Sequence, residues 1–224
     1  MSIAQNITQF NQSLPLEVKL VAVSKTKSNE AIMEAYQSGQ RLFGENKVQE
    51  LLQKWEALPK DIEWHFIGHL QSNKVKYLAP FISMIHAVDS YKLLQTINDE
   101  GRKIGRIVPC LVQFHIAEEQ SKFGLDPDSA DLFFQDVDLA NLKHVAISGV
   151  MGMATFTPNT TQIDQEFLKL KNLFEVLKTT VFSQNTGFSE ISMGMSHDYQ
   201  QAIRNGSTMV RIGSSIFGDQ NDTP

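Results

Sequence analysis

Residues 19–44 read KLVAVSKTKSNEAIMEAYQSGQRLFG and contain a complete strand–helix–strand unit. The first six residues are mainly apolar and rich in valine, which is typical of a strand buried on both faces. Residues 28–39 begin with a serine N-cap, carry apolar side chains at helical spacing and end at a glycine, so they predict a helix. Residues 41–44 then form the next strand.

The same alternation continues along the chain. Further strands are expected at residues 63–68, 84–88, 108–115, 145–151, 190–194 and 209–212. Between the strands, apolar side chains recur at helical spacing in four inward-facing stripes: Val48, Leu51, Leu52 and Trp55; Leu93, Leu94 and Ile97; Ala130, Leu132 and Phe133; and Phe167, Leu170, Phe174 and Leu177.

Strands that alternate with helices predict an α/β fold with a parallel sheet, because parallel neighbours need a crossover connection. Eight units in 224 residues take about 28 residues each, which fits a single (β/α)8 barrel of the TIM type. A doubly wound open sheet is the main alternative, but residues 21–26 lack the glycine-rich turn of its nucleotide site. We expect one domain over residues 1–224, with a helix at 1–15 packed on the barrel and a tail at 219–224.

The composition is that of an ordinary globular protein, with 42% apolar residues and a formal net charge of −5. This charge disfavours nucleic acid and anionic membranes as partners, since both reward clustered lysine and arginine. Cys110 is the only cysteine and lies in an apolar run, so we expect a buried thiol in a reducing compartment. Residues 1–10 lack the features of a signal peptide, and no apolar run approaches the ~18 residues of a membrane span, so a cytoplasmic protein is expected.

Polar residues follow the predicted strands, where barrel enzymes carry their sites. Two such segments suit a phosphate: residues 192–196 (SMGMS), before an expected helix at 198–205, and residues 212–215 (IGSS). They follow strands seven and eight, the pair that commonly binds phosphate in such barrels. The alternative is that these serine and glycine turns only cap helices.

Two basic residues stand out at strand ends. Lys25 directly follows the first strand, where a desolvated amine could form a Schiff base with an aldehyde cofactor. The alternative is a lysine that extends to water. Arg211 lies inside the apolar run 209–213 and needs a planar acceptor, which could be a structural carboxylate or a cofactor ring nitrogen.

Two tempting motifs carry little weight. His65 and His69 lie four residues apart on a strand, about 13 Å from each other, and lack the glutamate of a zinc-binding HExxH motif. No metal site is therefore expected. Ser196, His197 and Asp198 are adjacent in the chain and cannot converge as a catalytic triad.

Several segments carry a family resemblance. They are LVAVSKTK at 20–27, FGENKVQE at 43–50, WHFIGHLQSNKVK at 64–76, HAVDS at 86–90, SKFGL at 121–125, SGVMGM at 148–153, SMGMSHDYQQAI at 192–203 and VRIGSSIFG at 210–218. The sequence resembles the pyridoxal-5′-phosphate homeostasis proteins of the YggS/PROSC type, which are similar to the barrel domain of alanine racemase.

The resemblance implies that the chain binds pyridoxal 5′-phosphate (PLP), with Lys25 as the Schiff-base lysine and Asn46 beside the cofactor. It also implies that Arg211 faces the pyridine nitrogen. The phosphate would be bound by Ser192, Ser196, Gly213 and Ser214. Met193 is also carried over as a cofactor-binding residue. No catalytic residue is carried over.

Two positions depart from the family pattern. His115 stands where asparagine is common, so the role of that position is open, while Ser214-Ser215 replaces threonine-alanine and keeps one hydroxyl. An arginine beside the pyridine nitrogen discourages its protonation and weakens the cofactor as an electron sink. The resemblance therefore implies a cytoplasmic, monomeric and non-catalytic PLP carrier in vitamin B6 and amino-acid or keto-acid balance, with apo PLP enzymes as possible acceptors. The alternatives are a weak PLP-dependent amino-acid racemase or lyase, and a cofactor-free barrel enzyme acting on a sugar phosphate.

Overall fold

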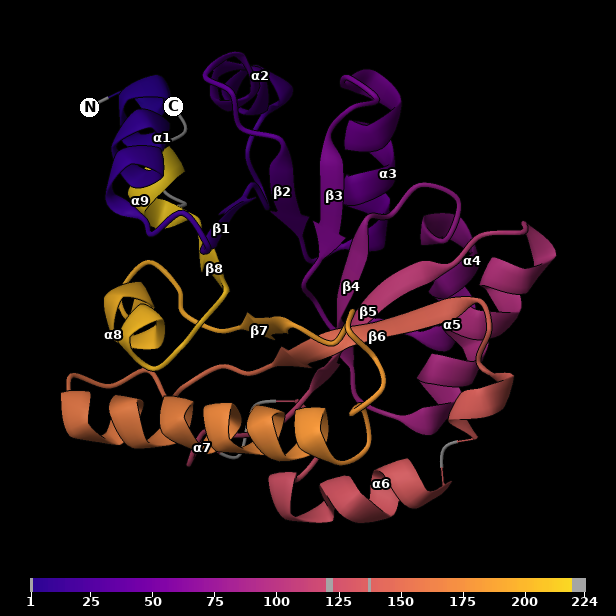
Figure 1. Ribbon diagram of the computed structural model, residues 1–224. Coiled ribbons are helices and arrows are strands. Elements are labelled where there is room, and N and C mark those ends of the chain that lie inside the picture. Colours follow the sequence, from indigo (N-terminus) through magenta and orange to yellow (C-terminus); the bar gives the residue numbers. More distant parts are fainter. Residues whose placement is uncertain (1, 120–122, 137, 219–224) are drawn as a thin grey trace.

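The predicted barrel is confirmed. A computed structural model describes residues 2–119, 123–136 and 138–218, and its strands close into one parallel barrel in the order β1 to β8 (Figure 1). The strands are β1 Lys19–Val23, β2 Leu42–Glu45, β3 Glu63–Phe66, β4 Met84–Val88, β5 Val108–Gln113, β6 Val145–Met151, β7 Glu190–Ser192 and β8 Met209–Ile212. The barrel closes where β1 pairs with β8, with Val21 opposite Arg211.

Helices follow the strands on the outside of the barrel (Figure 1). The α-helices are α1 Ile3–Ser13, α2 Asn29–Gln37, α3 Val48–Ala57, α4 Val75–Leu78, α5 Tyr91–Lys103, α6 Ala130–Asp136, α7 Thr160–Thr179, α8 Tyr199–Arg204 and α9 Ser214–Phe217. Short 3-10 helices lie at η1 Ser72–Lys74, η2 Pro127–Ser129 and η3 Leu139–Asn141. The Ser28 hydroxyl caps α2 by accepting from the Ala31 N–H, as its sequence predicts.

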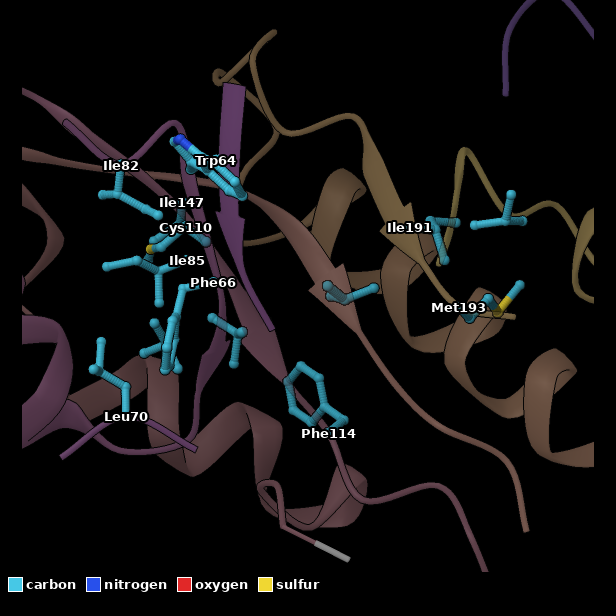
Figure 2. Packing of buried hydrophobic residues seen from close by; sticks show 14 of the residues in the cluster. Trp64, Phe66, Leu70, Ile82, Ile85, Cys110, Phe114, Ile147, Ile191 and Met193 are labelled. Carbon is cyan, nitrogen blue, oxygen red and sulfur yellow. The ribbon is translucent and has the colours of Figure 1, made fainter. Parts of the chain in front are cut away.

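The main core lies between the strands and the surrounding helices. Outward-facing strand residues such as Phe43 and Trp64 pack there with their ring centroids 5.8 Å apart. Cys110 pairs in register with Ile85 on one side and Ile147 on the other, and the three side chains gather in this core (Figure 2). Burial raises the pKa of the Cys110 thiol well above its ordinary value, so this cysteine is a buried packing residue.

One predicted stripe is partly wrong. Leu132 was expected to face inward on α6, but it is 65% exposed, whereas Phe134 is buried and packs edge-to-face on Phe182. The physical reason is the helical period, because residues 130, 133 and 134 share one face of a helix and residue 132 points away from it. The stripe Phe167, Leu170, Phe174 and Leu177 on α7 is buried as predicted.

A bulge shapes the middle of β6. Cys110 pairs with Ile147 but Leu111 pairs with Gly149, so Ser148 is an extra residue on the β6 side. Gly149 has φ +155°, and a Cβ atom there would lie 1.9 Å from the Glu190 carbonyl oxygen of β7. Glycine is therefore the residue that lets β6 and β7 approach each other at this point.

The first helix joins the last one. In Figure 1, α1 lies beside α9, and the Asn6 side-chain amide donates to the Ile216 carbonyl at 2.9 Å. The helix expected at residues 1–15 spans Ile3–Ser13, while the tail expected at 219–224 lies outside the described residues. Within the described part of the chain, no helix is long and apolar enough to cross a membrane.

Candidate functional site

A pocket of about 770 Å³ opens at the carboxyl ends of the strands. Its lining comes from the loops after β1, β2, β3, β5, β6, β7 and β8, as a site at this face of a barrel requires. The lining residues are Val23, Lys25, Lys27, Asn46, Ile67, Gly68, His69, Gln113, Phe123, Met153, Met195, Ser196, His197, Arg211, Gly213, Ser214 and Gly218.

The charged side chains of this lining are all basic. Lys25, Lys27 and Arg211 are basic, and no aspartate or glutamate is among the described residues that line the pocket. The chain as a whole carries a net charge of −5, so the pocket concentrates positive charge on an acidic protein. Such a pocket suits an anionic small molecule.

Lys25 follows β1 and is half-buried at the pocket wall. Within residues 2–119, 123–136 and 138–218, its amine has no hydrogen bond or ion pair. By contrast, the amine of neighbouring Lys27 donates to the Gly218 carbonyl at 3.0 Å. Of these two lysines, Lys25 is therefore the one whose amine can meet a ligand without first breaking such a contact.

Arg211 forms part of the pocket floor and is buried in β8. Its guanidinium donates to the Ser192 hydroxyl at 2.6 Å and to the Gly152 carbonyl at 3.1 Å. Burial lowers the pKa of Arg211 to about 10, with Asp198 acting in the opposite direction. The side chain thus remains a cation at neutral pH and is held by two acceptors beneath the pocket.

A column of buried polar side chains extends from Arg211 into the barrel. The Ser192 hydroxyl lies 3.0 Å from His86 Nδ1, and His86 Nε2 lies 2.9 Å from His65 Nδ1. We call these four residues the polar column. The interiors of such barrels are usually filled by branched aliphatic side chains. The polar column is therefore unusual, and its position beneath the pocket connects it to the site.

Arg211 sets the direction of every hydrogen bond in the column. A guanidinium only donates, so Ser192 Oγ accepts from it, and among the described residues His86 Nδ1 is the acceptor within reach of the serine proton, which is otherwise left unpaired. His86 consequently carries its proton on Nε2 and donates to His65 Nδ1. Burial lowers the pKa of His65 to about 3, and burial, with His65 and the Arg211 cation nearby, lowers that of His86 well below 6.5, so both rings are neutral at pH 7.

An anion site lies beside the column. The backbone N–H groups of Gly213 and Ser215 both point at the Ser196 hydroxyl oxygen, at 3.2 Å and 3.5 Å. The helix expected at 198–205 is α8, Tyr199–Arg204, and the Asp198 carboxylate just before it accepts the Met195 N–H at 2.5 Å. The Ser196 hydroxyl and the amides of the β8 loop thus gather at one place, where the two amides donate to the serine oxygen in the absence of a ligand.

Asn46 completes the pocket after β2. Its side-chain oxygen is buried and has no hydrogen-bond partner in the structure, which is unusual for a buried polar atom. Gly68 lies against it, because a Cβ at residue 68 would come within 2.4 Å of the Asn46 carbonyl. A polar ligand with a hydrogen-bond donor would satisfy this buried acceptor at the pocket wall.

Comparison with known proteins agrees with this geometry. The family model "Alanine racemase, N-terminal domain" matches residues 1–221. The pyridoxal phosphate homeostasis protein of Haemophilus influenzae is 40% identical over 91% of this chain and 86% of its own length. The human protein of the same name is 38% identical over 98% of this chain and 83% of its own. This chain belongs to the pyridoxal phosphate homeostasis protein family.

Solved structures place the same fold in this family and beyond it. PipY of Synechococcus elongatus PCC7942, solved without PLP, is 33% identical with a TM-score of 0.90, covering 97% of this chain and 100% of its own. The same protein with PLP bound gives a TM-score of 0.83 at 32% identity. Alanine racemase of Clostridium difficile 630 is 13% identical with a TM-score of 0.77 over 56% of its length, a likeness of fold alone.

Most of the site residues predicted for this family member meet in the pocket. Lining residues among them are Lys25, Asn46, Ser196, Arg211, Gly213 and Ser214. Ser192 and Met193 do not line it, because both are fully buried at and just beyond the end of β7. Ser192 instead accepts a hydrogen bond from Arg211, and Met193 packs in the core, while the cofactor contact expected of these two stays a prediction.

Sequence reasoning missed other parts of the site of this homeostasis protein. Gln113 lines the pocket and donates to the Phe123 carbonyl at 2.8 Å, and Phe123 stacks on His69 at the rim. His86 was overlooked, although its position two residues before the end of β4 places it inward, beside His65 of β3. His115 is half-buried outside the lining, and Lys122 lies outside the described residues.

Proposed function

We propose that this chain binds pyridoxal 5′-phosphate through Lys25 and serves the cell as a PLP homeostasis protein that holds the cofactor and releases it. The observation that carries this proposal is the pocket itself. It brings an amine that has no partner among the described residues together with a buried cation and a set of anion donors. The homeostasis proteins of similar sequence and the PLP-bound PipY structure support the choice of ligand.

The residues present fit this ligand. PLP is a phosphate ester with a polar aromatic ring, and the pocket offers three cations, hydroxyl and amide donors, and no lining carboxylate within the described chain. The buried side-chain oxygen of Asn46 lacks a donor, which a ring hydroxyl can supply. When bound, the cofactor supplies an aldehyde that a lysine amine can capture reversibly.

Each of the proposed site residues then has a defined role. The Lys25 amine holds the aldehyde, and Ser196 with the amides of Gly213 and Ser215 binds the phosphate. Arg211, a permanent cation fixed by Ser192, faces the ring nitrogen and keeps protons away from it. This arrangement favours storage of the cofactor over its use in carbanion chemistry.

The first experiment tests the site. Purified protein is mixed with PLP, reduced with borohydride and digested, and the modified peptide is mapped by mass spectrometry. The label is expected on Lys25, lost in Lys25→Met and retained in Lys27→Met. Absence of a label, or a label on another lysine, contradicts the assignment.

The second experiment tests the function. Protein loaded with PLP is incubated with an apo PLP enzyme, and the activity gained by that enzyme is followed over time. We expect transfer at a rate above that of the Lys25→Met control. No transfer, together with clear racemisation of a free amino acid, would favour the weak racemase instead.

We further propose that the protein works in the cytoplasm as a single-domain monomer, without nucleic acid or membrane partners. The unpaired, buried Cys110 and the net charge of −5 support this proposal. Light scattering after size exclusion tests the monomer, since a mass near twice 25.2 kDa contradicts it.

A further inference from the structure

Both peptide groups that flank Lys25 are held by side chains of the next β/α unit. On the N-terminal side, the Ser24 carbonyl accepts from Lys54 Nζ at 2.8 Å. On the C-terminal side, the Thr26 N–H donates to Glu50 Oε1 at 2.6 Å. The backbone that carries Lys25 is therefore anchored immediately before and after it.

The anchoring side chains form one ionic cluster. Lys54 Nζ donates to Glu45 Oε1 at 2.8 Å and to Glu50 Oε1 at 2.6 Å, in addition to the Ser24 carbonyl. An ammonium group has three donors, and all three are used here. We call Lys54, Glu45 and Glu50 the Lys54 clamp.

The clamp is largely buried, and removing its charged groups from water costs free energy. The side chains of Lys54 and Glu45 are only 6% and 0% exposed, and the Ser24 hydroxyl donates to Glu45 Oε1 at 2.6 Å. Buried ion pairs are seldom better for stability than apolar packing of the same volume. None of the three clamp residues lines the ligand pocket, so the clamp acts on the site through the backbone.

Thr26 shows that the clamp imposes a conformation. Its φ is +65°, in the left-handed region, and it is the only described residue other than glycine with a positive φ. A β-branched residue rarely adopts this conformation, so the surrounding contacts must hold it. Two contacts hold it: the turn hydrogen bond from the Lys27 N–H to the Ser24 carbonyl at 3.0 Å, and the Glu50 bond to the Thr26 N–H.

We propose that the Lys54 clamp positions the Lys25 amine for covalent capture of the cofactor aldehyde. In that step the amine nitrogen adds to the aldehyde carbon, a C=N bond forms, and the aldehyde oxygen leaves as water, with no change of oxidation state. Glu45, Glu50 and Lys54 are positioning residues, since none touches the reacting atoms. This inference rests on the proposed function and names residues that set its rate.

The test separates capture from binding. Three variants are compared with the wild type: Glu50→Ala removes the acceptor of the Thr26 N–H, Glu50→Gln keeps an acceptor oxygen, and Glu56→Ala is the control on the exposed side of the same helix. Capture of PLP is followed by absorbance and by borohydride trapping on Lys25. Pyridoxine 5′-phosphate, which has an alcohol in place of the aldehyde, measures binding without capture.

We expect Glu50→Ala to slow capture by about tenfold or more, because a misplacement of about 1 Å can cost up to ~10²-fold in rate. Its Kd for pyridoxine 5′-phosphate should stay within about twofold of wild type, since pocket contacts are intact. Glu50→Gln should recover part of the rate, and Glu56→Ala should match the wild type. An unchanged capture rate in Glu50→Ala, or equal losses of capture and binding, overturns the proposal.

A ligand-free measurement keeps the two proposals apart. Hydrogen exchange at the Thr26 amide should be faster in Glu50→Ala than in the wild type or Glu56→Ala, and unchanged exchange contradicts the clamp. Failure of the wild type to capture PLP contradicts the proposed function instead. Normal capture by the wild type and by Glu50→Ala contradicts the positioning role alone.

Discussion

Arg211 orders the protons of the barrel interior, and this has a direct spectroscopic consequence. Both His86 and His65 should be neutral, with the proton on Nε2, because the column starts from a group that can only donate. Long-range ¹H–¹⁵N NMR spectra of the ligand-free protein report this tautomer directly. A proton on His86 Nδ1 would contradict the direction of the column.

Ser192→Ala provides the matching variant. It removes the acceptor of Arg211 and the donor to His86, so the fixed Nε2–H tautomer of His86 should give way to a mixture. The unfolding free energy should fall by about 1–3 kcal/mol, since a buried donor loses its partner. Ser189→Ala, at an exposed serine just before β7, should leave both the tautomer and the stability unchanged.

His65 also makes stability depend on pH. In the unfolded chain this histidine takes up a proton near pH 6.5, whereas in the folded protein its pKa is about 3. The unfolded state therefore binds more protons as the pH falls below about 6.5, and the native state is destabilised by roughly 1 kcal/mol per pH unit. Urea unfolding between pH 7 and pH 5 should show this slope, and His65→Gln should show a shallower one; equal slopes would contradict it.

The sequence predicted residues that line the pocket, but it did not predict the polar column beneath the pocket. The topology sets the place of these lining residues, because they lie at the carboxyl end of a strand or in the loop after it: Lys25, Asn46, Ser196, Arg211, Gly213 and Ser214. Ser192 was assigned to the phosphate because it shares the same motif, yet the inward direction of its strand turns it toward Arg211 and His86. Motif membership does not reveal on which side of a strand end a side chain lies.

At the scale of the elements, the Gly149 bulge makes a strong stability prediction. Gly149→Ala should lower the unfolding free energy by about 3 kcal/mol or more, because its Cβ would lie 1.9 Å from the Glu190 carbonyl oxygen. Gly105→Ala is the matched control. It also has a positive φ, +66°, but no atom within 4 Å of the new Cβ, so a cost of about 1 kcal/mol is expected. Similar losses in both variants would show that the contact with β7 is unimportant.

The strand boundaries were predicted to within two residues. The predicted bounds of β4, β6 and β8 are those observed, while β1, β3, β5 and β7 end one or two residues earlier than predicted. Of the extra residues, Ile67 and Gly68 line the pocket, whereas Phe114 and Met193 are buried in the core.

At the scale of the whole molecule, the barrel is tied together at its seam. Asn6 of α1 reaches the carbonyl of Ile216 in α9, so the first and last helices stabilise each other. Asn6→Ala should lower the unfolding free energy by about 1 kcal/mol, as expected for one lost hydrogen bond. Asn11→Ala, at an exposed position of the same helix, should cause no loss of stability in thermal or urea unfolding, because alanine favours a helix more than asparagine does. A loss equal to that of Asn6→Ala would contradict the role of the Asn6 contact.

The pairing of β1 with β8 also determines when the site forms during synthesis. Lys25 comes from the first strand and Arg211 from the last, and the two strands become neighbours only when β8 pairs with β1. A growing chain on the ribosome therefore holds the lysine long before it can hold the cation and the phosphate donors beside it. Cofactor binding by this protein should thus begin only after translation of β8, which makes a bound cofactor a signal of a closed barrel.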